Sequence, residues 1–298
     1  LTIDEFYWRD KPKFYEFTRA AFERMRDAGT RTLIIDIRAN EGGDGAIGGK
    51  VLAHLVSRSF TFISDQSTTR YERVPYDLAR YLDTWDFSFF DRTGQVEKIT
   101  EGTAAGKYRY LPNARKIQTI EPEAPLYRGK TYILISSENS SATFQFAQLA
   151  KQSKAATLVG QTTGGNQRGL NGGQLAWVVL PNSGVAVDIP LLAATYAVTT
   201  ADAGINPDIP VTPSFEARAA DRDQEMEMVV RLIDGILDIH ESGIAGRYGI
   251  GVIGNPAAPA RRVQTPVFNA GNTERQGIMA GGHARAAAEY DIFPVTYQ

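Results

Sequence analysis

Ser141 is the residue of this sequence best placed to do chemistry. It lies at the start of a helix predicted over 140–152, just after a buried strand predicted over 131–136. A serine at such a junction projects its hydroxyl from the carboxyl edge of a sheet, where α/β proteins bind ligands. The first amides of the helix lack intrahelical partners, so the N–H of Ala142 can donate to an oxyanion. The pattern indicates acyl transfer with Ser141 as nucleophile; the alternative is that the serine only caps the helix.

A pair of glycines could supply a second oxyanion donor. The turn Asn40-Glu41-Gly42-Gly43 ends a β-branched run over 31–38. Neither Gly42 nor Gly43 has a Cβ, so the backbone can approach a substrate carbonyl closely. Plain turn chemistry explains the same residues, and the two roles are compatible.

A serine hydroxyl is a poor nucleophile until a neighbouring group takes its proton, and few groups here could do so. His54 falls inside a predicted helix, where a lone histidine is more often structural or exposed. Lys151 and Lys154 share the predicted helix of Ser141, about 15–20 Å along it at a rise of 1.5 Å per residue. That distance is too long for a base.

The elements that position these residues follow from apolar periodicity. Helices are predicted over 11–28 and 46–57, and strands over 31–38, 131–136 and 156–159. The strand, helix, strand order over 131–159 implies parallel strands with a right-handed crossover. Asp36 and Arg38, at the end of the first strand, are expected to pair with each other and support the turn.

Other patterns are more local. Two apolar runs, 174–180 and 185–190, flank Pro181-Asn-Ser-Gly184 and predict a β-hairpin. Further expectations are a helix over 71–85, an extended stretch over 106–111 and a helix from about 217 to 239.

Composition restricts the classes of function. The 298 residues are 43% hydrophobic and 22% charged, which suits a globular protein. The 32 basic and 34 acidic residues are scattered, so nucleic-acid binding is not expected. No apolar run approaches the roughly 20 residues of a membrane helix, so membrane insertion is not expected either. Cysteine is absent and the three histidines lack ligand spacing, so we expect no metal and no cofactor.

Three separated segments, Asp36–Gly43, Glu138–Thr143 and Val159–Asn166, together resemble the C-terminal processing (tail-specific) serine peptidases and the tricorn core peptidase. The likeness runs from about residue 32 to 213 and includes Gly204-Ile-Asn-Pro207-Asp208, which is similar to the family's closing Gly-x-x-Pro-Asp motif. The order and spacing of the motifs carry the match. The resemblance implies a crotonase-like α/β core with a mostly parallel sheet flanked by helices, plus the β-hairpin.

The resemblance also implies roles for single residues. The family pattern Ser-Ala-Ser-Glu aligns with residues 141–144, which makes Ser141 the nucleophile and leaves Ser140 as the helix cap. Gly43, in preference to Gly42, and Ala142 would supply the amides of the oxyanion hole. The residues expected to contact the substrate are Gly42, Gly165 and Asn166.

The family's base is a lysine in a motif like Gly-x-x-Thr-x-Gly-Lys. Here Gly160-Gln-Thr-Thr163-Gly-Gly165-Asn166 has Asn166 at that position, and an asparagine cannot accept the proton. In the tricorn-type arrangement the base is a histidine from an earlier segment, with an acidic partner later in the chain. Asp202 is the carboxylate nearest to that partner's position. The sequence starts at Leu1 without an initiator Met, so we expect a preceding segment that could carry such a histidine.

We therefore expect a serine-type peptidase that hydrolyses peptides or unfolded proteins in the periplasm or cell envelope. The alternative is a degenerate peptide-binding or scaffold domain that kept the fold and lost the base. The catalytic core is expected over 1–243, followed by an irregular tail or appended segment over 244–298 that is rich in Gly, Ala, Pro and Arg. A homo-oligomer is left open.

Overall fold

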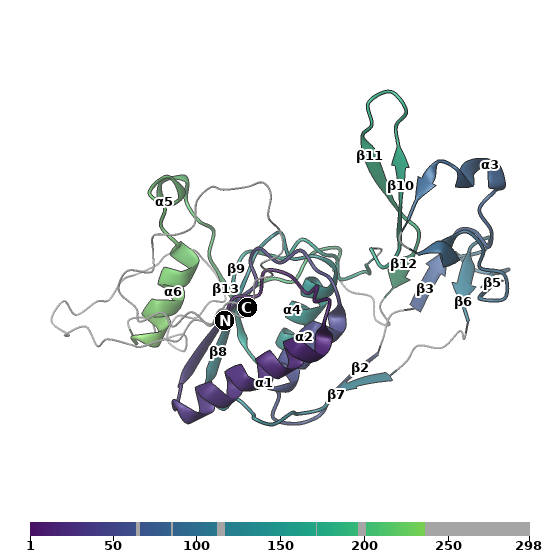
Figure 1. The fold of residues 1–298 in the computed structure, drawn as a ribbon. Coiled ribbons are helices and arrows are strands. Elements are labelled where there is room, and N and C mark those ends of the chain that lie inside the picture. Colours follow the sequence, from purple (N-terminus) through teal and green to yellow (C-terminus); the bar gives the residue numbers. More distant parts are fainter. Residues whose placement is uncertain (64–65, 85, 112–116, 171, 196–200, 236–298) are drawn as a thin grey trace. The chain divides into compact units, whose positions relative to one another are not determined.

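The computed structural model describes residues 1–63, 66–84, 86–111, 117–170, 172–195 and 201–235 (Figure 1). Contacts divide the chain into two compact units. Among the described residues, the first unit comprises 1–58, 121–164 and 206–235, and the second lies within 59–120 and 165–205. The predicted boundary at 243/244 and the predicted tail lie outside the described residues. Each unit is described by itself.

The first unit is built on a four-stranded parallel sheet. Its order is β1-β8-β9-β13, and all three pairings are parallel. The central strand is buried from Thr131 to Ile135, as expected for a strand covered on both faces. The prediction of parallel strands is confirmed. The strands are β1 (Thr32–Asp36), β8 (Lys130–Ile135), β9 (Thr157–Gly160) and β13 (Ile209–Pro210).

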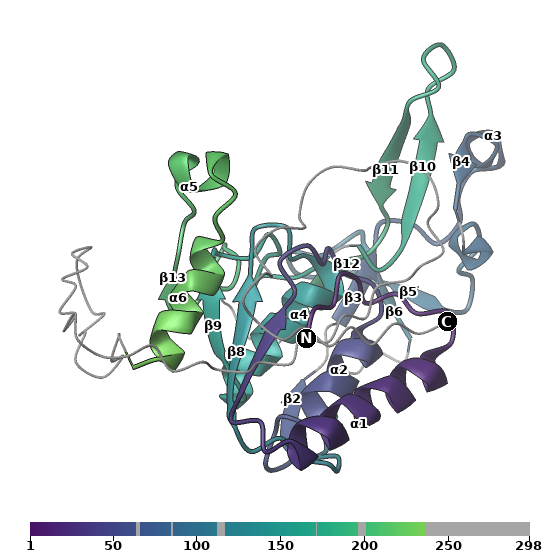
Figure 2. The ribbon, with the colours of Figure 1, turned by 60° about the vertical axis from the view of Figure 1, so that its left-hand side comes forward.

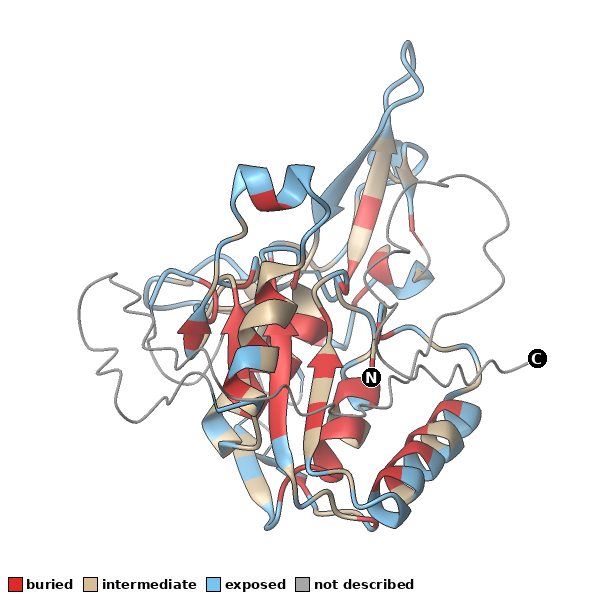
Figure 3. Ribbon diagram, turned by 90° about the vertical axis from the view of Figure 1, so that its left-hand side faces the viewer, coloured by how far each residue is buried: buried red, intermediate tan, exposed pale blue. Residues whose placement is uncertain are grey.

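Helices cover both faces of this sheet (Figures 2 and 3). Tyr132 and Leu134 of β8 pack in one buried cluster with Val229 and Leu232 of α6. Alternate residues of a strand point to opposite faces, so Ile133 and Ile135 face the other side, where α4 lies packed against α2. The helices predicted near 11–28, 46–57 and 140–152 are confirmed with small shifts of their ends. Their bounds are α1 (Lys11–Asp27), α2 (Gly45–Ala53) and α4 (Ser141–Ser153).

The predicted single helix over 217–239 is wrong within the described residues. Two short helices, α5 (Phe215–Ala219) and α6 (Gln224–Ile233), replace it. The backbone of Asp221 takes a positive φ of 54°, which ends the first helix. The carboxylate of Asp223 then accepts a hydrogen bond from the N–H of Met226 at 2.9 Å and so caps a new helix.

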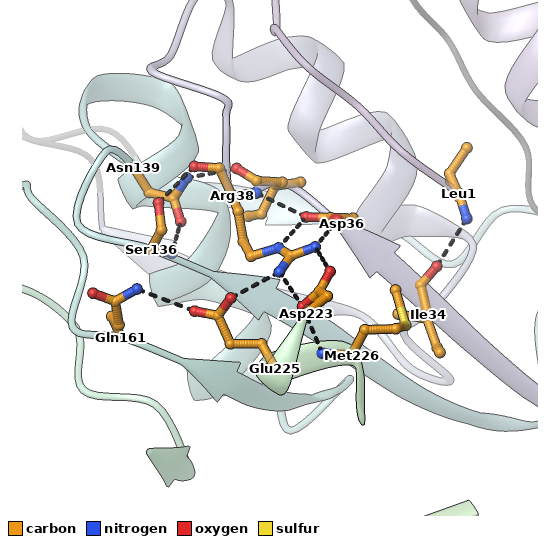
Figure 4. Close-up of polar contacts among 11 residues, drawn as sticks. Leu1, Ile34, Asp36, Arg38, Ser136, Asn139, Gln161, Asp223, Glu225 and Met226 are labelled. Atoms are coloured by element: carbon orange, nitrogen blue, oxygen red, sulfur yellow. Dashed lines mark hydrogen bonds and ion pairs between the residues drawn. The ribbon is translucent and has the colours of Figure 1, made fainter. Parts of the chain in front are cut away.

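Arg38, two residues after β1, joins the sheet to α6 (Figure 4). Its Nε and Nη2 donate to the two oxygens of Asp36 at 3.0 and 2.6 Å, which confirms the predicted pair. Both Nη atoms donate to Asp223 at 2.7 Å, and Nη1 donates to Glu225 at 2.7 Å. Glu225 also accepts from the amide of Gln161 at 3.1 Å. One guanidinium therefore holds three carboxylates from two distant segments.

These contacts shift the pKa values of Arg38 and Asp223. Burial disfavours the charge of Arg38, but the hydrogen bonds to Asp36 and Asp223 outweigh burial and raise the pKa of Arg38. Burial also acts to raise the pKa of Asp223, but its hydrogen bond to Arg38 prevails and leaves the pKa below its usual value. Asp223 thus stabilises the fold above its unfolded-state pKa near 3.8, and this contribution is lost as pH falls through the folded value.

His54 caps α2 and is wholly buried. Its Nδ1 lies 3.0 Å from the carbonyl oxygen of Glu123 and 3.1 Å from that of Pro125, so Nδ1 carries the proton. The ring stacks on Phe22 with centroids 4.5 Å apart. Nε2 has no partner among the described residues, and burial lowers the pKa of the ring.

The described residues of the second unit form three small antiparallel sheets and two short helices. One pairs β2 with β7, a second has the order β12-β3-β6-β5, and a third has the order β11-β10-β4. The predicted hairpin is confirmed as β10 and β11, and the extended stretch near 106–111 is β6. The bounds are β2 (Phe60–Ile63), β3 (Gln66–Thr69), β4 (Leu82–Asp83), β5 (Val96–Lys98), β6 (Tyr108–Tyr110), β7 (Ile117–Ile120), β10 (Leu175–Val179), β11 (Ala186–Pro190) and β12 (Ala193–Thr195).

The predicted helix over 71–85 is wrong. Among the described residues of this range, only α3 (Tyr76–Ala79) is helical, because the chain then extends into β4 and pairs with β10. A short 3-10 helix, η1 (Phe87–Phe89), follows. None of the helices in the described ranges is long and apolar enough to cross a membrane.

Replacing Arg38 by Met should remove the shared cation and leave three partly buried carboxylates facing one another. We expect a loss of about 3 kcal/mol in the free energy of unfolding, the lower end for a broken buried pair because Arg38 is one-fifth exposed. Urea unfolding at pH 7 measures the loss. The matched control is Arg222→Met, which breaks the exposed pair with Glu227 and should change the free energy of unfolding much less than Arg38→Met does. Equal losses in the two variants would contradict the assigned role of Arg38.

The buried ring of His54 predicts a dependence of stability on pH. Because the folded pKa is lower than the usual 6.5, the unfolded chain binds the proton first as pH falls. The free energy of unfolding should therefore decrease from pH 6.5 downward, until the folded pKa is reached. In His54→Asn the amide can still donate to the two carbonyls but does not titrate, so this part of the decrease should vanish. Chemical unfolding of both proteins between pH 5 and 8 checks it, and identical pH profiles would count against it.

Candidate active site

Ser141 is the first residue of α4 and has an unusual backbone. Its φ is +47°, a conformation that non-glycine residues rarely adopt and that typically costs on the order of 1 kcal/mol. Its Oγ makes no hydrogen bond to any residue that the structure describes. Ser140 occupies the N-cap position, as predicted, but its hydroxyl donates to the carbonyl oxygen of Glu41 at 2.6 Å and does not cap the helix. The strained turn therefore leaves one hydroxyl of the pair free, that of Ser141.

Gly42 lies directly against this serine. A Cβ at Gly42 would come within 2.8 Å of the Cβ of Ser141 and 3.3 Å of its Oγ. A side chain there would have to push the two turns apart, so the approach requires glycine. The N–H of Gly42 is already used, because it donates to Oδ1 of Asn40 at 3.0 Å.

Gly43 presents an unused amide at the same turn. Phe6 pairs with the backbone on both sides of Gly43: its N–H donates to the carbonyl of Gly42 at 2.8 Å, and its carbonyl accepts from Asp44 at 2.6 Å. In such a pairing the intervening residue turns its own N–H away from the partner strand. No acceptor for the N–H of Gly43 is found in the described part of the chain. This favours Gly43 over Gly42 as an oxyanion donor.

The N–H of Ala142 is a second unused amide. It lies in the first turn of α4, where backbone donors have no partner within the helix, and no described residue accepts from it. Gly43 and Ala142 follow neighbouring parallel strands, so both amides belong to the same carboxyl edge of the sheet. This edge is the expected place for a ligand site in an open α/β sheet.

Two buried asparagines join the turns that carry these groups. Asn139 donates from Nδ2 to the carbonyl oxygens of Ile37 at 2.6 Å and Asn40 at 3.0 Å, and its Oδ1 accepts from the N–H of Ser136 at 2.8 Å. Both Asn40 and Asn139 are completely buried. Neither asparagine is assigned a role from the sequence. A signal existed, because each stands four residues after the end of a parallel strand, β1 or β8.

Gly164 brings the third sequence segment to the same turns. Its N–H donates to the carbonyl oxygen of Asn139 at 3.0 Å, and a Cβ at Gly164 would lie 2.2 Å from the carbonyl oxygen of Ser137. The glycine therefore permits the loop after β9 to pack against the loop after β8. The remaining predicted site residues, Gly165, Asn166 and Asp202, belong to the second unit.

Asn166 and Asp202 contact each other within the second unit. Nδ2 of Asn166 donates to one oxygen of Asp202 at 2.7 Å, and Arg168 donates to the other at 2.8 Å. The N–H of Arg168 also donates to Oδ1 of Asn166 at 2.8 Å. All three side chains lie at the surface of this unit. The partners of Asp202 are thus an amide and a guanidinium, and the catalytic role expected for it stays a prediction.

The basic residues considered earlier are engaged elsewhere. Nδ1 of His54 is held by two backbone carbonyls, and Lys151 donates to the carbonyl of Asn206 at 2.6 Å and pairs with Asp208 at 2.9 Å. Lys154 follows the last turn of α4, at the end opposite Ser141. Within the described residues, no base is hydrogen-bonded to Ser141 Oγ.

Several solved structures are similar to this chain. A putative peptidase from Parabacteroides merdae has 17% identity and a TM-score of 0.48, over 78% of this chain and 59% of that one. The photosystem II D1 C-terminal processing protease has 19% identity and a TM-score of 0.39, over 71% and 41%. Mature CPAF complexed with lactacystin has 15% identity and a TM-score of 0.47, over 79% and 52%. The chain therefore spans between 41% and 59% of the length of these three structures.

No curated protein matches the chain. The profile of peptidase family S41, in contrast, matches residues 1–211. The match covers well over half of the chain and includes β1, β8 and β9 with the turns that follow them. The chain belongs to peptidase family S41.

Proposed function

We propose that this protein is a serine peptidase of the C-terminal processing kind that hydrolyses peptide bonds in peptides or unfolded proteins. Ser141 is the nucleophile, and the amides of Gly43 and Ala142 form the oxyanion hole. The observation that carries the proposal is the hydroxyl of Ser141, which lies on a strained turn and has no hydrogen-bond partner among the described residues. The same sheet edge carries the amides of Gly43 and Ala142, for which the described residues offer no acceptor. Membership of peptidase family S41 supports the same reaction.

The reaction follows from this chemistry. Ser141 Oγ attacks the substrate carbonyl, and negative charge develops on the carbonyl oxygen. The N–H groups of Gly43 and Ala142 stabilise that charge, and removal of one such donor typically costs about 3 kcal/mol of transition-state stabilisation. Collapse of the tetrahedral intermediate expels the amine and leaves an acyl-enzyme at Ser141, which water then hydrolyses.

The proton of Ser141 needs an acceptor. The resemblance to the tricorn-type arrangement supports a histidine from a segment that precedes residue 1, with Asp202 as its acidic partner. In that arrangement the imidazole takes up the proton, Asp202 stabilises the imidazolium, and the imidazolium then gives the proton to the leaving amine. Asn166, at the position of the family's lysine, then contributes to binding the substrate rather than to proton transfer.

A second candidate function is peptide binding without hydrolysis. It is favoured by Asn166, which stands in place of the lysine and donates to Asp202 at 2.7 Å. On this alternative the oxyanion amides bind a peptide carbonyl, and Ser141 is never activated.

The family resemblance further supports a location in the periplasm or cell envelope, and a homo-oligomer remains compatible with both functions.

Ser141→Ala in the full-length protein should reduce cleavage of fluorescein-labelled casein by at least about 10³-fold, because the nucleophile is lost. Ser153→Ala is the matched control, since it removes a serine hydroxyl from the opposite end of α4, where Ser153 donates to the carbonyl of Leu149 at 2.7 Å. This control should retain most of the activity. If wild type and Ser141→Ala release fluorescein equally slowly yet bind casein equally well, the binding function replaces the peptidase.

Asn166→Lys tests which base the site uses. With a histidine base, the new lysine should not accelerate labelling of Ser141 by a serine-directed fluorophosphonate. The rate of labelling in the full-length protein, with Ser141→Ala as the blank, is the measurement. An acceleration of tenfold or more would assign a lysine-type site whose base this protein has lost.

A further inference from the structure

One side-chain oxygen, Oδ1 of Asn40, receives hydrogen bonds from both turns of the site. It accepts from the N–H of Gly42 at 3.0 Å and from the hydroxyl of Thr143. Thr143 is completely buried in the first turn of α4. The loop after β1 and the helix after β8 are therefore anchored to the same atom.

The two anchored groups are the immediate neighbours of the two free amides. Gly42 directly precedes Gly43, and Thr143 directly follows Ala142. Each oxyanion donor is thus one residue away from a group that Oδ1 of Asn40 holds. This oxygen therefore helps to set the separation of the two donors, because a peptide unit is rigid and planar. The bonds from Ser140 to Glu41 and from Asn139 to Asn40 also join the two turns.

Asn40 is itself held on every side. Its Nδ2 donates to the carbonyl of Ile3 at 3.0 Å, and its backbone N–H donates to the carbonyl of Ile37 at 2.9 Å. Its own carbonyl accepts from Asn139 at 3.0 Å. Because the side chain is completely buried, no water competes for these bonds.

We propose that Asn40 and Thr143 are positioning residues that set the spacing of the oxyanion hole. This inference rests on the proposed peptidase function. Neither side chain touches the substrate: they act through the amides of Gly43 and Ala142. Oxyanion donors need to be held within about 0.5 Å of their productive positions, so loss of the shared anchor should act on the transition state more than on substrate binding.

Thr143→Val tests the hydrogen bond between Thr143 and Asn40, because it removes the hydroxyl and keeps the shape of the side chain. We expect kcat for fluorescein-labelled casein to fall between about 10- and 100-fold with little change in KM, since the interaction matters only when the oxyanion forms. Thr143→Ser keeps the hydroxyl and should restore kcat to within about threefold of wild type.

Thr18→Val is the matched control for stability. Thr18 is also a buried helical threonine, and its hydroxyl donates to the carbonyl of Phe14 at 2.8 Å in α1. Both Val variants should lower the midpoint of thermal unfolding by similar amounts, but only Thr143→Val should lower kcat. Equal effects on kcat in the two variants, or a Thr143→Val variant within twofold of wild type, would overturn the proposal.

Amide hydrogen exchange separates this proposal from the peptidase proposal. Peptides covering residues 40–44 and 140–144 should exchange faster in Thr143→Val than in Thr143→Ser, and unchanged exchange would refute the shared anchor. If wild type shows no Ser141-dependent cleavage, the peptidase proposal and the catalytic role of the pair both fail. The exchange result would then still decide whether Asn40 and Thr143 hold the two turns together.

Discussion

The buried amides of Asn40 and Asn139 are the interactions on which the candidate site depends. Two parallel strands, β1 and β8, end side by side. After each strand the backbone turns and enters a helix, α2 after β1 and α4 after β8. Such turns leave backbone N–H and C=O groups without partners in the sheet, and burying them unpaired would be costly. The two asparagines pair the carbonyls of Ile3, Ile37 and Asn40 and the amides of Ser136 and Gly42. The backbone groups that stay unpaired are then few.

Because the two asparagines pair most backbone groups of these turns, a backbone amide that stays unpaired there is informative. Among the described residues, the amides of Gly43 and Ala142 are donors without an acceptor in turns whose other donors are mostly paired, which makes these two amides available for a ligand. The positive φ of Ser141 adds a second cost that packing must sustain. Within the described residues, a strained backbone and amides without acceptors therefore occur around the same two turns, and such features cluster at functional sites.

The ion cluster around Arg38 is a second source of stability for the first unit. Arg38 lies only two residues before Asn40, and it ties the strand end to α6 through Asp223 and Glu225. The same short segment therefore carries a structural ion cluster on one side and the glycine turn on the other. This division explains why Asp36 and Arg38 lie in a motif shared with the family and yet have no contact with Ser141 among their recorded partners.

Local sequence was sufficient for the parallel core and for the position of Ser141 at the start of a helix. Apolar runs and glycine breaks marked β1, β8 and β9, and the strand-to-helix junction marked Ser141, because these features depend on residues close together in the chain. Local patterns were misleading where a distant partner decides, as at 71–85, where β4 pairs with β10, and at 217–239, where Asp223 caps a new helix.

Only the tertiary structure decided which amides are free and what holds them. The N–H of Gly42 donates to Asn40, whereas the pairing with Phe6 leaves the N–H of Gly43 without an acceptor among the described residues. The hydroxyl of Thr143 anchors α4 to the same asparagine. Asp202 pairs with Asn166, although 36 positions separate them. The sequence by itself determined the serine and its strand-to-helix setting. The tertiary structure decided its hydrogen-bonding surroundings, since those bonds join segments whose separation along the chain leaves no periodic signal.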